Sequence, residues 1–258
     1  MRMTELLVVA AALALPFGAA VAKDEALTTA LGAPHRSANF VARDAARHPS
    51  EVLEFAGLKP TYTVVEVSPG GGYWTEILAP YLKTKGTYYT AVSARAKDNW
   101  QKKLAAGPDL YGAVKVTEMA PGTEIAPAGS ADLVLTFRNV HNWMSQGVAD
   151  EAFASFHKAL KPGGVLVVEE HRASTATPQD PKAANGYVRE DYTIELAKKA
   201  GFELVERSEL LANPKDTKDW PKGVWTLPPS LAMGEQDREK YVAIGEADNF
   251  LLKFRKPK

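Results

Sequence analysis

Short apolar runs alternate along the chain with segments of helical periodicity. Runs rich in β-branched and apolar residues are typical of strands buried in a parallel sheet. We expect strands over 63–67, 87–92, 114–117, 132–137, 165–169, 202–205 and 250–254. Apolar residues spaced three or four apart indicate helices. We expect these over 36–47, 50–57, 73–81, 96–105, 148–160 and 191–200.

This alternation of strands and helices predicts an α/β fold. Strand–helix–strand units place parallel strands side by side, so the expected architecture is a doubly wound, mostly parallel sheet with helices on both faces. In such a sheet, ligands bind outside the carboxyl ends of the strands. The residues that directly follow the first, second, fourth and fifth strands are therefore the candidates for chemistry.

A glycine-rich turn follows the first strand. It reads Ser68-Pro69-Gly70-Gly71-Gly72 and leads into a helix. Glycines here let the backbone approach a ligand, and a helix start offers free N–H groups to an anion. The G-x-G-x-x-G spacing of a dinucleotide site does not fit in either alignment, which disfavours a nicotinamide oxidoreductase. The alternative is a tight turn that binds nothing.

The N-terminus has the layout of a secretory signal peptide. Arg2 precedes an apolar run from Leu6 to Leu15, Pro16 ends the run, and small residues surround Ala22. A run of ten is shorter than the about 20 residues that span a bilayer. We therefore expect residues 1–22 to be removed and the protein to be exported, to the periplasm; the alternative is an uncleaved anchor. Residues 23–258 form one expected domain, with N-terminal helices over 23–58 and a lid-like insertion over 212–248.

Composition narrows the possible partners. Lys and Arg together number 31, and so do Asp and Glu, so the formal charge is zero. A binder of nucleic acid usually carries a basic excess, so a small-molecule substrate is the better expectation. Cysteine is absent, which excludes disulfides and thiolate metal sites. No stable membrane span is expected after signal cleavage, and nothing in the sequence indicates the oligomeric state.

Three segments together resemble class I S-adenosylmethionine-dependent methyltransferases. The first is Glu66 to Gly72, similar to a hydrophobic strand with an acidic residue followed by G-x-G-x-G, with Ser68 in place of the first glycine. The second, 131–140 (ADLVLTFRNV), resembles the fourth-strand motif, and the third, 160–166 (LKPGGVL), resembles the turn before strand five. The run PGGGY-x-TEILAPYL behind an export signal is also similar to a group of exported bacterial proteins predicted to be methyltransferases.

The resemblance implies a Rossmann-like methyltransferase fold, a seven-stranded sheet with its last strand antiparallel, and S-adenosyl-L-methionine as cofactor. Ser93 stands where the family carries the acidic residue that binds both ribose hydroxyls, and Glu118 would contact the adenine. The cofactor-binding residues implied in this way are Glu66, Ser68, Gly70, Gly71, Gly72, Ser93, Glu118, Arg138 and Asn139.

His141 is the candidate catalytic base, because it lies in the expected loop after strand four and histidine titrates near neutral pH. It could equally hydrogen-bond a loop. Substrate contacts are expected from Trp143, His171, Tyr187 and Trp225, which could instead serve packing. The spacing of the five histidines shows no metal signature, so no metal is expected.

The sequence thus predicts methyl transfer from S-adenosylmethionine to a small-molecule or lipid-like acceptor that it does not identify. The alternative is a non-catalytic periplasmic protein that binds a ligand on a methyltransferase scaffold. The missing carboxylate at Ser93 and the expected export both keep that alternative open.

Overall fold

A seven-stranded sheet in the order β3-β2-β1-β4-β5-β7-β6 forms the centre of the computed structural model, which describes residues 24–258. β7 pairs antiparallel with both β5 and β6, and the other neighbouring pairs are parallel. This confirms the expected fold class. The strands are β1 (Thr63–Val67), β2 (Thr87–Val92), β3 (Lys115–Glu118), β4 (Ala131–Phe137), β5 (Leu160–His171), β6 (Glu203–Ser208) and β7 (Asn249–Arg255).

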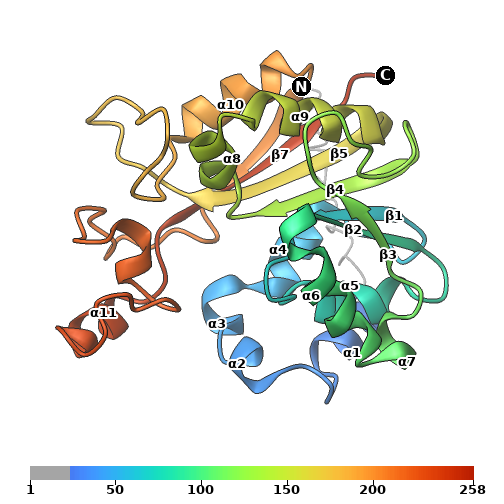
Figure 1. The fold of residues 1–258 in the computed structure, drawn as a ribbon, viewed down its shortest axis with the longest axis horizontal. Coiled ribbons are helices and arrows are strands. Elements are labelled where there is room, and N and C mark those ends of the chain that lie inside the picture. The colour runs from blue at the N-terminus through green and yellow to red at the C-terminus, as the bar shows by residue number, and fades with distance from the viewer. Residues whose placement is uncertain (1–23) are drawn as a thin grey trace, which may run out of the picture.

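Helices cover both faces of the sheet (Figure 1). One layer contains α8 (Val140–Gln146), α9 (Ala149–Ala159) and α10 (Glu190–Lys199). The opposite layer contains α1 (Glu25–Leu31), α4 (Pro49–Ala56), α5 (Thr75–Leu82), α6 (Ala94–Ala105) and α7 (Pro108–Tyr111). Neighbouring residues of one strand face different layers: Val65 packs in the core beneath α8 and α9, whereas Val64 packs beneath α4 and α5. Burial on both faces explains the continuous apolar runs.

The expected helix over 36–47 is divided into α2 (Ala38–Val41) and α3 (Asp44–Arg47). His48 ends α3 in a left-handed conformation with φ 43°. The end of α3 has a local cause, because the ring of Pro49 disfavours the helical conformation in the residue before it. Arg43, directly before α3, and Arg47, its last residue, both line a cavity at the carboxyl end of the sheet.

A second difference concerns His141, which we expected in a loop. It lies instead in the first turn of α8, which Gly147 ends with φ 72° before α9 begins. The sequence signal for α8 is short, and the glycine interrupts the periodicity that would have joined it to α9. The strand expected over 165–169 is also longer, because Leu160 already pairs with Ala131.

The segment 212–248, which we call the lid, contains the 3₁₀ helix η1 (Gly223–Thr226) and α11 (Arg238–Ile244). It has a small core of its own, with Val224, Leu227 and Tyr241 buried against Tyr187. Figure 1 shows it beyond one end of β5 and β7. Within residues 24–258 no helix is long and apolar enough to cross a membrane. The expected signal peptide, residues 1–22, lies outside the described residues.

Candidate active site

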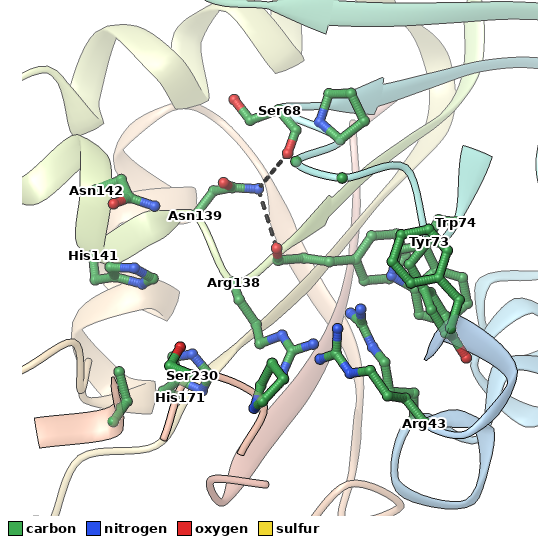
Figure 2. Close-up of a pocket in the computed structure, with 18 of the residues that line it drawn as sticks. Arg43, Ser68, Tyr73, Trp74, Arg138, Asn139, His141, Asn142, His171 and Ser230 are labelled. Carbon is green, nitrogen blue, oxygen red and sulfur yellow. Dashed lines mark hydrogen bonds between the residues drawn. The ribbon is translucent and has the colours of Figure 1, made fainter. Parts of the chain in front are cut away.

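Three adjoining cavities open where β1, β4 and β5 end, and Ser68 and Asn139 line all three. The first, of about 450 Å³, lies between the glycine turn, the α2–α3 segment and the lid (Figure 2). The second, of about 340 Å³, lies above Gly70 and Gly71 against α6. The third, of about 430 Å³, reaches Glu118 at the end of β3. Together they form one cleft along the carboxyl ends of the strands.

The glycine turn forms the floor of this cleft. Ser68, Gly70 and Gly72 have φ of 52°, 58° and 93°. Ser68 thus adopts the left-handed conformation that favours glycine, at the position where the methyltransferase motif has one. A Cβ on Gly70 would meet nothing within 4 Å, whereas one on Gly72 would come within 2.6 Å of Lys103 Cε. Gly70 and Gly71 line the first and second cavities, and Gly72 gives α6 room to pack.

Asn139 ties this turn to the end of β4. Its Nδ2 donates to the carbonyl oxygens of Val67 at 3.2 Å and Ser68 at 3.4 Å. Figure 2 shows its side chain between the turn and Arg138. The amide thereby fixes the backbone of the turn next to all three cavities, so Asn139 has a positioning role in addition to the cofactor contact that we expected.

Glu66 lies buried beneath the turn and lines the first cavity. Thr75 Oγ1 donates to its carboxylate at 2.7 Å, and the Tyr88 hydroxyl donates as well. Burial raises the pKa of Glu66 to about 7, although both hydrogen bonds oppose that rise. Its carboxylate is therefore held by side chains from α5 and β2.

Ser93 and Glu118 both line the third cavity, so the structure brings together the residues expected at the ribose and the adenine. Trp143 lines the same cavity and is otherwise buried against Phe156. It does not line the first cavity, and its substrate contact stays a prediction. No carboxylate replaces Ser93 among the residues that line the second cavity.

Three arginines line the first cavity: Arg43, Arg47 and Arg138. Arg43 donates Nε and Nη2 to Glu246 at 2.6 and 2.9 Å, and Arg138 donates Nη1 to the same carboxylate at 2.6 Å. Burial opposes ionisation of Glu246, but these hydrogen bonds and charges outweigh it and hold its pKa at about 2. Arg138, expected at the cofactor, is thus largely engaged in joining the end of β4 to the lid.

Arg47 is different, because the one ion pair that it makes within residues 24–258 is long. Its side chain is 6% exposed, and Nη2 reaches Glu169 only at 3.5 Å. Its Nε has no hydrogen-bond partner among the described residues, and its guanidinium lies 4.3 Å from the ring centre of Tyr73. Burial and the charge of Arg138 lower its pKa to about 10, so the group remains charged at neutral pH. A buried charge with unused donors on a cavity wall is a candidate anion site.

His141 and His171 both line the first cavity, and their ring centres are 5.6 Å apart. Glu170 lies behind them: its Oε1 is 3.0 Å from His141 Nδ1, and its carboxylate also accepts the backbone N–H groups of both histidines. Although burial opposes it, the charge and hydrogen bond of His141 lower the pKa of Glu170. The carboxylate thus holds the His141 ring in one orientation.

The expected aromatic contacts divide into two groups. Trp225 lines the first cavity, and its ring centre is 5.9 Å from that of His141. Tyr187 is 1% exposed, and its hydroxyl donates to Asp216 at 2.9 Å, within the core of the lid. Tyr187 therefore does not line any of the three cavities.

Sequence reasoning missed Arg43, Arg47 and Glu246 and gave Glu170 no role of its own. The spacing of Arg43 and Arg47, four residues apart in an expected helix, was the available signal. Glu246 carries no local signal, because its partner Arg43 is 203 residues away in the sequence.

No protein-family model matches the chain, and no curated protein matches its sequence. The fold of the chain is nevertheless similar to solved structures. A methyltransferase dependent on S-adenosylmethionine from Aquifex aeolicus superposes with a TM-score of 0.56 at 16% identity, over 83% of this chain and 93% of that one. Phosphoethanolamine N-methyltransferase 2 of Haemonchus contortus, solved with S-adenosyl-L-methionine, gives 0.57 at 15% identity, over 91% and 60%.

The [4+2]-cyclase SpnF is similar to the same degree, with a TM-score of 0.57 at 18% identity over 83% of this chain and 81% of that one. At these identities the likeness shows the fold. The chain therefore has the Rossmann-like fold of class I S-adenosylmethionine-dependent methyltransferases. Since a cyclase shares this fold, the activity has to be argued from the cleft.

Proposed function

We propose that the protein transfers a methyl group from S-adenosyl-L-methionine to a small-molecule or lipid-like acceptor. One observation carries the proposal: the bare backbone of Gly70 and Gly71 is the floor of a cleft that reaches Ser93 and Glu118 on one side and His141 on the other. That cleft matches a ligand with an amino-acid end, a ribose and an adenine, which leaves the part of the first cavity beside the lid for the acceptor.

The residues present fit this cofactor. The Cβ that Gly70 lacks would project into open space, so the turn is shaped for a close ligand. Arg47, with unused donors on the wall of the same cavity, would bind the carboxylate of the amino-acid end. Ser93 would give one hydrogen bond to the ribose, and Glu118 would accept from the adenine amino group.

The chemistry that the cofactor supplies when bound is an electrophilic methyl group on a sulfonium. The protein aligns the acceptor with that methyl group and keeps water out. We assign Trp225 and the lid prolines Pro228 and Pro229 to the acceptor, because they line the first cavity opposite the glycine turn. For an acceptor with a hydroxyl group, His141 Nε2 would take the proton while Glu170 holds Nδ1.

Binding and transfer can be tested separately. Titration of the purified protein with S-adenosylmethionine and S-adenosylhomocysteine should show saturable heat, with a Kd below about 100 µM. Absence of binding of both up to about 1 mM would overturn the proposal. A mixture of hydroxyl and amine compounds incubated with isotopically methyl-labelled cofactor should then yield labelled products, identified by mass spectrometry.

The second candidate is a ligand-binding protein without turnover. Ser93 favours it, because a single hydroxyl cannot accept both ribose hydroxyls as a carboxylate does. This candidate predicts a nucleoside-like molecule that copurifies with the protein and no labelled product. Ser93→Asp tests where the ribose binds. The variant should bind the cofactor more tightly if the ribose lies at Ser93, and its affinity should be unchanged if the ribose lies elsewhere.

We also propose that the protein is exported to the periplasm with cleavage after Ala22, as in the group of exported bacterial proteins that the sequence resembles. The apolar run from Leu6 to Leu15 and the small residues before Lys23 support this. The intact mass of the protein from a periplasmic fraction should correspond to a chain that begins at Lys23. A chain that retains Met1 in the membrane fraction would contradict it.

A further inference from the structure

Three potential metal ligands meet at the wall of the first cavity. His141, Glu170 and His171 each offer one ligand atom, these atoms lie within 4.8 Å of one another, and all three residues are buried. Both histidines line the cavity, and Figure 2 shows them on the same side of it. The arrangement depends on the tertiary structure, because His141 begins α8 whereas Glu170 and His171 end β5.

The hydrogen bonds around the cluster orient both rings. His171 Nδ1 lies 2.7 Å from Asn249 Oδ1, while Asn249 Nδ2 donates to Ala247, so the Asn249 oxygen faces the ring. An amide oxygen can only accept, so His171 carries its hydrogen on Nδ1 and keeps the lone pair on Nε2. Glu170 Oε1 lies 3.0 Å from His141 Nδ1, close to the spacing of two ligands of one ion, so His141 would bind the ion through Nδ1 in place of that hydrogen bond. An outer partner such as Asn249 is typical of a histidine that binds a metal.

We propose that His141, Glu170 and His171 bind a divalent transition-metal ion such as Zn²⁺. Two imidazole nitrogens and one carboxylate oxygen are a donor set that Zn²⁺ accepts, with a fourth position left open. Bonds of about 2.1 Å to a tetrahedral ion place ligand atoms roughly 3.4 Å apart, so separations of up to 4.8 Å must shorten by at most about 1.4 Å, through rotation of the side chains. The open position would face the first cavity.

The charges around the cluster allow such an ion. Arg138 lines the same cavity as the two histidines, and Glu169 and Glu246 already pair with its guanidinium. Glu170 supplies the negative charge within the cluster itself. The proposal rests on side-chain geometry and does not depend on the proposed function. It has a consequence for that function, because a His141 lone pair bound to an ion is not free to accept a proton.

Metal binding can be measured without any methyl acceptor. The purified protein, without an affinity tag and treated with EDTA, is titrated with Co²⁺ followed by visible absorption, and with Zn²⁺ by calorimetry. We expect one ion per chain, a visible band from four-coordinate Co²⁺ that Zn²⁺ removes, and a Kd of about 1 µM or below for Zn²⁺. His171→Ala and His141→Ala should each weaken Zn²⁺ binding at least about tenfold.

His157→Ala is the matched control, because that histidine packs against Phe202 at another place in the fold and should not change the affinity. Glu170→Gln should also weaken Zn²⁺ binding. Because glutamine has nearly the size of glutamate, this variant should still fold even if a histidine variant does not. The proposal is overturned if the protein gives neither the Co²⁺ band nor heat with Zn²⁺. It is equally overturned if folded His171→Ala and His141→Ala bind Zn²⁺ as tightly as the unaltered protein.

Discussion

The Glu170 carboxylate lies 3.0 Å from His141 Nδ1, with both side chains almost wholly enclosed by the protein. The same carboxylate accepts the backbone N–H groups of His141 at 3.1 Å and His171 at 2.8 Å. One buried side chain at the end of β5 thereby fixes the start of α8 and the orientation of a ring that faces the first cavity.

Replacement of Glu170 tests how much its carboxylate stabilises the fold. Glu170→Ala leaves three buried donors without an acceptor, and we expect a loss of about 3–5 kcal/mol in the free energy of unfolding. Glu170→Gln should cost clearly less, because its amide oxygen still accepts. Urea denaturation measures both values. Glu195→Ala, at an exposed position of α10, should stay within about 0.5 kcal/mol. Equal stabilities for Glu170→Ala and Glu195→Ala would show that the carboxylate does not hold this corner.

Arg47→Met tests the assignment of the cofactor carboxylate. Methionine retains the apolar stem against Tyr73 and removes the guanidinium. We expect the affinity for S-adenosylmethionine to fall about ten- to a hundredfold, which corresponds to a lost charged hydrogen bond. Methylthioadenosine lacks the amino-acid end and should bind both proteins equally. A parallel loss for both ligands would instead place Arg47 in a purely structural role.

Gly70→Val tests the floor of the cleft. The new side chain would project into the space assigned to the cofactor, so binding should be lost. The left-handed φ of 58° adds strain of about 1–2 kcal/mol. Gly129→Val supplies the matched control, since Gly129 has φ 66°, open space around its missing Cβ and no place in the three cavities. Calorimetric titration should show that Gly129→Val binds S-adenosylmethionine as tightly as the unaltered protein. If Gly70→Val also keeps that affinity, the cofactor does not bind at the glycine turn.

Glu246→Gln tests the tie between the lid and the arginines through its pH dependence. A pKa of about 2, against 4.5 for an ordinary glutamate, means that ionised Glu246 stabilises the fold by about 3 kcal/mol above pH 4.5. This stabilisation is lost as the pH falls from 4.5 toward 2. Denaturant unfolding should therefore show Glu246→Gln less stable at pH 7, with a difference that narrows through this interval. A difference independent of pH would contradict the ion pair.

Periodicity and turn chemistry were enough to predict a doubly wound, mostly parallel sheet and the floor of the cleft, whereas the antiparallel last strand was expected from the resemblance to methyltransferases. The glycine turn, Asn139 and the ends of β1 and β4 could be found because each is a local pattern at a strand end. Parallel topology then brings those ends to one edge of the sheet. His141 and His171 were identified for the same reason, as residues beside strand ends. The position of Tyr187 in the chain did not reveal its hydrogen bond with Asp216, which holds it within the core of the lid.

The sequence by itself determined the order of strands and helices, the turn after β1 and a neutral, cysteine-free composition. The tertiary structure decided which charges meet: His141 with Glu170 across 29 residues, Arg47 with Glu169 across 122, and Arg43 with Glu246 across 203. Local patterns arise from backbone geometry that repeats every two or 3.6 residues. Contacts between distant residues depend on how layers pack, so the arginine wall and the histidine–glutamate cluster became visible only in the folded chain.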